Sequence, residues 1–379
     1  MICAAVIFTV ASWFPANAVT AFAAGKTKEA NRPHHVFLIV LENESYDDTF
    51  AKPSEAPYLY ALAHRRGKLL SGYYAIGHDS LDNYIAMISG QAPNDSTQSD
   101  CPVYADFKPH GAKPGQDGQV TGIGCVYPAS VLTIANQLDQ KGLKWRAYME
   151  GMTRDCEHPA IGDVDSTQNA TLDPKTHRYR QYAARHDPFV YFHALIDRPE
   201  CGKNVVPLTE LDSDLKSVAT TPNFAFITPN LCNDGHDSQC VDGKPGGLVA
   251  IDRFLKNSKI VDRITASPAF KKDGMLIVTF DEAGYGDGGR CCAEQPGPNT
   301  AAPGKYGPGG GKTGAIVISK FSCPGTVDAT PYNHYSLLKS VEQLFGLHYL
   351  GFANQKGLKA FGPDVYDAAA GASACKKAM

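Results

Sequence analysis

The sequence predicts an α/β fold with a mostly parallel central sheet and helices on both faces. Three continuous apolar runs, at 36–41, 224–227 and 275–280, are rich in β-branched and aromatic residues. Such runs are typical of strands that are buried on both faces of a parallel sheet. Segments with helical spacing of apolar residues alternate with these strands, which favours a sheet covered on both sides.

This alternation can be followed along the chain. The run at 36–41 is the first expected strand, and 80–89 is an expected helix because Leu81, Tyr84, Ile85 and Ile88 repeat at helical spacing. The expected helices at 130–141 and 335–345 are followed directly by Gly142 and Gly346, as is common at helix ends. The remaining expected strands are 68–75, 145–149 and 315–319, and the remaining expected helices are 130–141, 247–257 and 335–345.

Three regions interrupt the alternation. Residues 91–128 and 151–222 are rich in Asn, Asp, Pro and Gly, and we interpret them as surface excursions of a single domain over 33–365. The third region, 284–312, is a long loop dense in Gly and Pro, and long loops in compact domains are often functional. We expect disulfides to pin the first two excursions, which contain Cys101, Cys125, Cys156 and Cys201.

The beginning of the chain predicts export. Residues 1–24 have a short apolar core and then small residues, as in a signal peptide and its cleavage site, and the core is too short for a transmembrane helix. The chain has 11 cysteines, and loss of Cys3 with this segment leaves ten, an even number that suits disulfides. We therefore expect a secreted or periplasmic protein without a transmembrane segment after cleavage. A cytosolic protein with free thiols is the alternative.

The overall charge gives no support for binding to polyanions. The formal net charge is −3 for 379 residues, so there is no electrostatic case for a nucleic-acid-binding module or an anionic membrane surface.

Acidic residues follow the three strongest strands, at the point where each strand ends. Glu42 and Asn43 follow the first run, and Asp281 and Glu282 follow the run at 275–280. The run at 224–227 leads to a third polar segment. Ligands collect beyond the carboxyl ends of parallel strands, and carboxylates gathered there are costly unless a cation neutralises them. The sequence therefore predicts a metal site at this edge. The third segment contains Asp234, His236 and Asp237.

Ser80 is the second candidate centre, because it lies where a loop becomes a helix. The free N–H groups of a helix N-terminus favour a phosphate or another anion beside its hydroxyl. Asn83, one helical turn later, could offer its amide to the same anion. The competing interpretation is that Ser80 only caps the helix, as serines often do.

Four segments together resemble the phosphoesterase family, which includes bacterial phospholipases C and secreted acid phosphatases within the alkaline phosphatase superfamily. The similarity extends over about 33–350 and implies an alkaline-phosphatase-like fold. The segments that carry it are Glu42-Asn43-Glu44-Ser45-Tyr46-Asp47, His78-x-Ser80-x-x-Asn83-Tyr84, Phe280-Asp281-Glu282 and Tyr332-Asn333-His334-Tyr335-Ser336-Leu337-Leu338.

The resemblance implies a role for each candidate residue. Ser80 would be the nucleophile that forms a phosphoserine, and Asn83 would stabilise the transition state with the helix N-terminus. Glu42, Asn43, Asp281 and Glu282 would hold a divalent cation, whose all-oxygen ligands suit Ca²⁺, Mg²⁺ or Mn²⁺, with Zn²⁺ not excluded. The leaving-group side would be lined by His78, His236 and His334, with Asp234 and Asp237. These five could donate a proton or bind a second cation, and the sequence leaves that choice open.

The sequence thus predicts a secreted metal-dependent phosphomonoesterase of the acid phosphatase type, acting on small phosphate esters. A phospholipase C or other phosphodiesterase is the first alternative, and a secreted binding protein that has lost turnover is the second. We also expect Cys232 and Cys240 to form a disulfide around Asp234 and His236, against the possibility that each pairs with a distant cysteine. The histidines without a partner pattern are expected to be surface or packing residues, and they include His110, His158, His177 and His186.

Overall fold

The computed structural model describes residues 32–51, 55–111, 113–366 and 375. The expected signal peptide, 1–24, lies outside these residues. The described residues fall in one compact unit.

An eight-stranded sheet lies at the centre of the described structure, in the order β13-β2-β12-β11-β1-β10-β6-β9. The pairs β11–β1, β1–β10, β10–β6, β6–β9 and β13–β2 are parallel, and β12 runs antiparallel to both of its neighbours. The prediction of a mostly parallel sheet is therefore confirmed. The strands are β1 (His35–Leu41), β2 (Lys68–Leu70), β6 (Trp145–Met149), β9 (Val205–Pro207), β10 (Phe224–Thr228), β11 (Gly274–Phe280), β12 (Ala315–Ser319) and β13 (Val327–Asp328).

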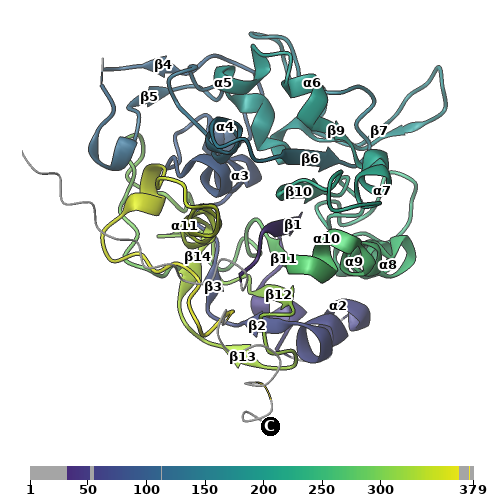
Figure 1. Ribbon diagram of the computed structural model, residues 1–379. Coiled ribbons are helices and arrows are strands. Elements are labelled where there is room, and N and C mark those ends of the chain that lie inside the picture. Colours follow the sequence, from purple (N-terminus) through teal and green to yellow (C-terminus); the bar gives the residue numbers. More distant parts are fainter. Residues whose placement is uncertain (1–31, 52–54, 112, 367–374, 376–379) are drawn as a thin grey trace, which may run out of the picture. The chain divides into compact units, whose positions relative to one another are not determined.

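Helices cover both faces of this sheet (Figure 1). Alternate residues of β1 divide between two cores, with Val36 and Leu38 in one and Phe37 and Ile39 in the other. This division follows from the period of two along a strand, and it explains why all of β1 is apolar. The first core includes α3 (Ser80–Ser89), α4 (Ile134–Gln140) and α11 (His334–Phe345), and the second includes α2 (Pro57–Ala61), α8 (Gly247–Ser258), α9 (Ile260–Ala266) and α10 (Pro268–Asp273).

Two expected elements differ in the structure. Helix α4 begins at Ile134 rather than at 130, because Thr133 and Asn136 form a capping box there. The expected strand at 68–75 is two strands, β2 and β3 (Tyr73–Tyr74), and β3 pairs with β14 (Tyr332–Asn333) outside the central sheet. The chain changes sheets at Gly72, where a Cβ atom would lie 2.6 Å from the Ala329 carbonyl oxygen, so only glycine fits.

The first two expected interruptions hold most of the short elements, and each of the three contains a disulfide. Disulfides join Cys101 to Cys125, Cys156 to Cys201, Cys232 to Cys240, Cys291 to Cys292 and Cys323 to Cys375. The expected Cys232–Cys240 bridge is therefore present. The short helices are α1 (Tyr46–Thr49), α5 (His193–Ile196), α6 (Cys201–Asn204), α7 (Leu211–Asp214) and the single turns η2 (Leu62–Arg66), η3 (Thr97–Ser99), η4 (Gln116–Gly118), η5 (Ala184–His186), η6 (Pro188–Tyr191), η7 (Leu208–Glu210) and η8 (Gly351–Asn354), and the short strands are β4 (Lys108–Pro109), β5 (Gly122–Ile123), β7 (Thr171–Leu172) and β8 (Tyr179–Arg180).

The region 151–222 is more than a surface excursion. It supplies β9, the edge strand of the central sheet next to β6. Its apolar run from Phe189 to Phe192 is fully buried in the same core as α3. The expectation of a purely superficial excursion was wrong here, because this short apolar run anchors the segment beneath the rest of the loop.

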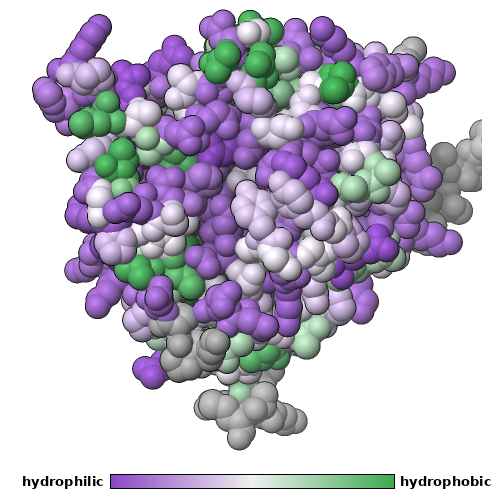
Figure 2. All heavy atoms as spheres, turned by 180° about the vertical axis from the view of Figure 1, so that it is seen from behind, coloured by the Kyte–Doolittle hydropathy of each residue, from purple (hydrophilic) through white to green (hydrophobic). Residues whose placement is uncertain are grey.

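Among the described helices, none is both long and apolar enough to cross a membrane. On the face seen in Figure 2, hydrophobic residues occur only in small separate groups on a mostly hydrophilic surface.

Candidate functional site

The acidic residues that follow β1, β10 and β11 meet at one edge of the sheet. The backbone N–H of Glu42 donates to the Asp234 carbonyl oxygen at 2.9 Å, and that of Asp281 donates to the Leu41 carbonyl oxygen at 2.9 Å. The parallel register, in which Leu41 pairs with Phe280, therefore places Glu42 next to Asp281. Glu42, Asp234 and Asp281 have no exposed surface, and Glu282 is 1 % exposed.

Ser80 lies against this acidic cluster at the start of α3. Its hydroxyl donates to Glu42 Oε2 at 2.8 Å, and the Tyr84 hydroxyl donates to Glu42 Oε1 at 2.6 Å. The helix is capped from outside, because the backbone N–H of Leu81 donates to Asp100 Oδ1 at 2.9 Å. Asp79, rather than Ser80, occupies the N-cap position. Ser80 is thus not the helix cap, and its hydroxyl faces the carboxylates.

Two residues of the site have positive φ values although neither is glycine. Asn43 has φ 56°, and Asp79 has φ 60° and ψ 151°. Residues other than glycine rarely adopt these backbone conformations, and residues held in them cluster at functional sites. The two strained positions directly follow Glu42 and directly precede Ser80.

Asn83 is engaged by the turn that precedes α3. Its Oδ1 accepts from the N–H groups of Ile76 and Gly77, and its Nδ2 donates to the carbonyl oxygens of Gly77 and Asp79. Both amide protons therefore already have backbone acceptors. In this arrangement Asn83 fixes the turn that carries Ser80, and its expected contact with an anion stays a prediction.

The three expected histidines occupy different surroundings. His334 Nε2 lies 2.5 Å from the Asp281 carbonyl oxygen, so it carries the proton, and Nδ1 accepts from the Tyr73 hydroxyl at 2.9 Å. Burial lowers the pKa of His334 to about 4, so this ring is neutral. His78 is buried with Nδ1 2.6 Å from Glu282 Oε2.

His236 is the partly exposed member of the three, with a side chain that is 29 % accessible. Its Nδ1 lies 3.0 Å from Asp237 Oδ1, and its Nε2 accepts from Arg185 Nη2 at 2.9 Å. Since a guanidinium can only donate, the ring proton is on Nδ1. Asp237 therefore accepts the ring proton of His236 and does not join the other carboxyl groups.

The structure brings two further residues into the site, Arg185 and His186, which come from the region 151–222. His186 Nδ1 lies 3.0 Å from Asp234 Oδ2, and its Nε2 lies 3.4 Å from Glu42 Oε1. His186 was expected to be a surface or packing residue; it is buried and stacks on Tyr84, and it also lies beside two carboxyl groups of the site. The signal that could have found it is the apolar run at 189–192, which predicts that the residues just before it are also buried.

Electrostatic repulsion is concentrated at these carboxyl groups. Burial, followed by the charges of Asp281 and Asp234, raises the pKa of Glu42 well above its usual value. Burial raises the pKa of Asp281 to about 7, and burial likewise raises the pKa of Glu282 well above its usual value. Arg185, which is 2 % exposed, brings one positive charge close to Asp100 but leaves the cluster rich in carboxyl groups.

The residues at this edge fit a divalent cation. Ligand atoms of Glu42, His186 and Asp234 all lie within 4.8 Å of one another. Asn43 Oδ1, Asp281 Oδ2 and His186 Nε2 are buried and have no hydrogen-bond partner in the described structure. Unpartnered ligand atoms beside repelling carboxylates are the surroundings that a cation stabilises. This grouping joins Glu42 and Asp234, which were expected in separate sets, and adds a nitrogen ligand to an expected all-oxygen site.

Comparison with known proteins identifies the family. The model of the phosphoesterase family matches residues 49–348. The chain belongs to the phosphoesterase family. The matched range includes Ser80, His186, Asp234 and Asp281, and it begins after Glu42 and Asn43.

Curated relatives of this chain include acid phosphatases. An acid phosphatase of Aspergillus fumigatus is 27 % identical over 83 % of this chain and 55 % of its own length. A phosphate-repressible acid phosphatase of Penicillium chrysogenum is 29 % identical over 76 % of this chain and 54 % of its own length. The chain thus spans about half the length of these fungal relatives. A phosphatidylinositol-3-phosphatase of Mycobacterium tuberculosis is 23 % identical over 84 % of this chain and 79 % of its own length.

The solved structures that match this chain are more distant in sequence. A protein of the alkaline phosphatase superfamily from Vibrio parahaemolyticus is 12 % identical, with a TM-score of 0.46 over 89 % of this chain and 69 % of that chain.

Proposed function

We propose that this protein is a metal-dependent phosphomonoesterase of the acid phosphatase type, with Ser80 as its nucleophile. The observation that carries the proposal is the hydrogen bond from the Ser80 hydroxyl to Glu42 inside a buried cluster of carboxyl groups. Membership of the phosphoesterase family and the names of the fungal relatives support the same class of reaction.

In the proposed reaction, the Ser80 oxygen attacks phosphorus while the bond from phosphorus to the ester oxygen breaks. Glu42 Oε2, at 2.8 Å, is placed to accept the Ser80 proton. Water then attacks the phosphoserine and releases phosphate and Ser80. We propose His236 as the proton donor to the leaving group, because its side chain is 29 % accessible whereas His78 and His334 are buried. In this role the His236 Nε2 must leave Arg185 and carry a proton.

We propose Glu42, His186 and Asp234 as ligands of the cation, with Asn43 and Asp281 contributing their unpartnered oxygens. A bound cation would neutralise the carboxylates and stabilise charge on the phosphoryl oxygens. An imidazole among the ligands favours Zn²⁺ or Fe²⁺ over Ca²⁺, Mg²⁺ or Mn²⁺. Glu282 is bound to His78 instead, so we propose that it positions this histidine.

Export is part of the proposal. The five disulfides of the described chain suit an oxidising compartment, since such bonds are rare in the cytosol. We propose a secreted or periplasmic location on this ground and on the predicted signal peptide.

One set of assays tests the proposed function. Wild-type protein, Ser80→Ala and Ser89→Ala are compared on an aryl phosphomonoester, an aryl phosphodiester and phosphatidylcholine, with and without a chelator. Ser89 is the matched control because it is a buried serine at the other end of α3, where its hydroxyl donates to the Ile85 carbonyl oxygen. We expect chelator-sensitive hydrolysis of the monoester, loss of turnover in Ser80→Ala and retained turnover in Ser89→Ala.

Other outcomes favour the alternatives. Faster hydrolysis of the diester or of phosphatidylcholine would favour a phosphodiesterase. The absence of turnover on all three substrates in the metal-loaded wild-type protein would favour a binding protein.

A further inference from the structure

Two exposed tyrosines contact each other beside the turn that precedes Ser80. Tyr285 and Tyr306 are 60 % and 61 % exposed, and their rings meet edge to face with centroids 5.6 Å apart. Among the aromatic ring pairs of the described residues, this is the one pair in which both side chains are more than half exposed. An exposed aromatic pair leaves apolar ring surface in water and is a common feature of ligand contacts.

The pair lies directly over the segment that precedes Ser80. The rings of Tyr285 and Tyr306 are centred 5.7 Å and 6.0 Å from the ring of His78. Lys305 forms an ion pair with Asp79, and its ammonium group lies 5.3 Å from the centre of the Tyr306 ring. Each of the two residues before Ser80 therefore contacts the loop that carries the tyrosines.

Close backbone packing holds the two tyrosines in place. The two arms of the loop 284–312 touch at Gly288 and Gly307, where a Cβ atom on Gly307 would lie 2.9 Å from the Gly288 Cα atom. The Gly309 N–H donates to the Gly288 carbonyl oxygen at 3.1 Å, and the Gly311 N–H donates to the Gly289 carbonyl oxygen at 2.9 Å. The loop is therefore built to bring its arms together, which sets the spacing of the two rings.

We propose that Tyr285 and Tyr306 form a platform that binds the leaving group of the substrate, and that the site prefers small phosphomonoesters of planar aromatic alcohols. This inference rests on the proposed function. A phosphate held at Ser80 must extend its ester group from the buried cluster toward solvent, and the exposed tyrosine pair contacts His78, two residues before Ser80. A flat ring stacks on exposed aromatic surface, whereas a short aliphatic alcohol gains little from it.

Binding of phosphonates tests the proposal without turnover. Calorimetry on the metal-loaded protein compares phenylphosphonate with methylphosphonate in wild type, Tyr306→Ala and Tyr306→Phe. We expect Tyr306→Ala to weaken phenylphosphonate about 3- to 10-fold and to leave methylphosphonate within about twofold. Tyr306→Phe should keep the wild-type preference because it retains the ring.

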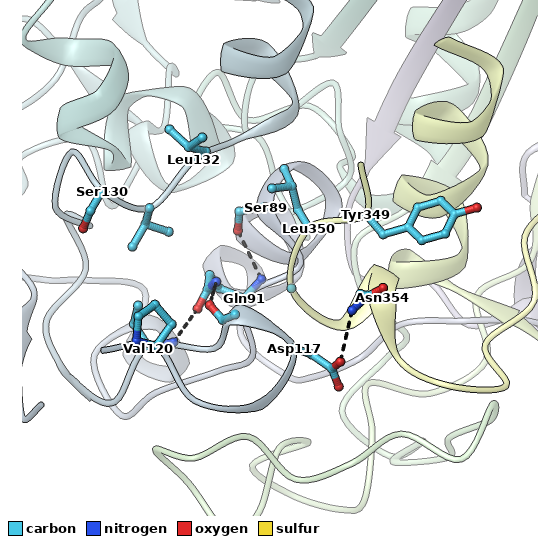
Figure 3. A pocket seen from close by; sticks show the side chains of 13 residues that line it. Ser89, Gln91, Asp117, Val120, Ser130, Leu132, Tyr349, Leu350 and Asn354 are labelled. Atoms are coloured by element: carbon cyan, nitrogen blue, oxygen red, sulfur yellow. Dashed lines mark hydrogen bonds between the residues drawn. The ribbon is translucent and has the colours of Figure 1, made fainter. Parts of the chain in front are cut away.

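Tyr349→Ala is the matched control, because Tyr349 is an exposed tyrosine near the end of α3 that is opposite to Ser80. It lines a pocket of about 470 Å³ together with Ser89, the last residue of α3 (Figure 3). We expect this variant to bind both phosphonates as wild type does.

A second pair of variants tests the loop itself. Gly307→Ala should push the arms apart at Gly288, while Gly286→Ala meets nothing within 4 Å and should be neutral. With an aryl phosphate, we expect Gly307→Ala to raise KM more than it lowers kcat, and to leave KM for glycerol phosphate nearly unchanged.

Two results would overturn the platform. One is an equal loss of affinity for both phosphonates in Tyr306→Ala, and the other is unchanged affinity for phenylphosphonate. If neither phosphonate binds wild-type protein, the proposed phosphate site itself is wrong, and the platform proposal, which depends on that site, is wrong too.

Discussion

Glu42 connects a strand, a helix and a loop region through one side chain. It accepts hydrogen bonds from Ser80 and Tyr84 on α3, and it lies 3.4 Å from His186 of the region 151–222. Because the carboxyl group is fully buried beside Asp281 and Asp234, its negative charge is costly without a cation. Metal binding and the protonation state of Glu42 are therefore expected to depend on each other.

The role of His186 can be tested by its effect on metal affinity. Replacing His186 with Gln removes the ring nitrogen that lies without a partner near Glu42, so we expect Zn²⁺ affinity to fall at least about tenfold. Calorimetric titration of the metal-free protein measures this change. His110→Gln is the matched control, because His110 is an exposed histidine of the region 91–128. An affinity within twofold of wild type in His186→Gln would exclude this residue as a ligand.

At the scale of elements, long apolar patterns were predictable and short elements were not. Strands β6 and β12 and helix α3 have the bounds expected from sequence, because each buries a continuous or periodic apolar pattern. The division of 68–75 into β2 and β3 depends on close contact of Gly72 with the distant Ala329, which no local pattern reports. Strand β9 was also not predicted, because it has only three residues and is defined by its pairing with β6.

Helix α11 carries a buried carboxyl group that should affect stability at high pH. Burial raises the pKa of Glu342 from 4.5 to about 9. The folded protein thus holds this proton more tightly than the unfolded chain does, so stability falls as pH rises from about 4.5 through about 9. We expect the urea midpoint of wild type to fall more steeply between about pH 6 and 9 than that of Glu342→Gln.

Glu200→Gln controls for loss of a carboxyl group as such, since Glu200 is exposed. It should show the wild-type slope. Parallel pH curves for wild type and Glu342→Gln would contradict the assignment of this effect to Glu342.

Two disulfides should differ in what they support. The Cys156–Cys201 bridge spans 45 residues and the Cys232–Cys240 bridge spans 8, so chain entropy predicts stability losses of about 4 and about 2.5 kcal/mol on replacement by serine pairs. The shorter bridge encloses Asp234 and His236, so its removal should lower kcat more than removal of the longer one. Denaturant unfolding of the two double variants measures which bridge contributes more to stability. Steady-state kinetics measure which of the two variants loses more kcat. A larger loss of kcat on removal of Cys156–Cys201 would refute this division.

At the scale of the whole molecule, the site is assembled from residues near positions 42, 80, 186, 234 and 281. The sequence allowed prediction of the residues at strand ends, because the carboxyl ends of parallel strands share one edge of a sheet. It allowed prediction of Ser80 because a helix begins there. It could not place His186 and Arg185, because their approach to Glu42 depends on how the region 151–222 packs under α3.

The identity of the nucleophile is the central claim, and trapping the phosphorylated protein tests it most directly. The metal-loaded protein is mixed with an aryl phosphomonoester, quenched in acid within milliseconds, digested and analysed by mass spectrometry. The account predicts one phosphoryl group on the peptide that contains Ser80, none on the same peptide of Ser80→Ala, and a wild-type pattern in Ser89→Ala. A phosphoryl group on another residue, or turnover of Ser80→Ala within threefold of wild type, would contradict it.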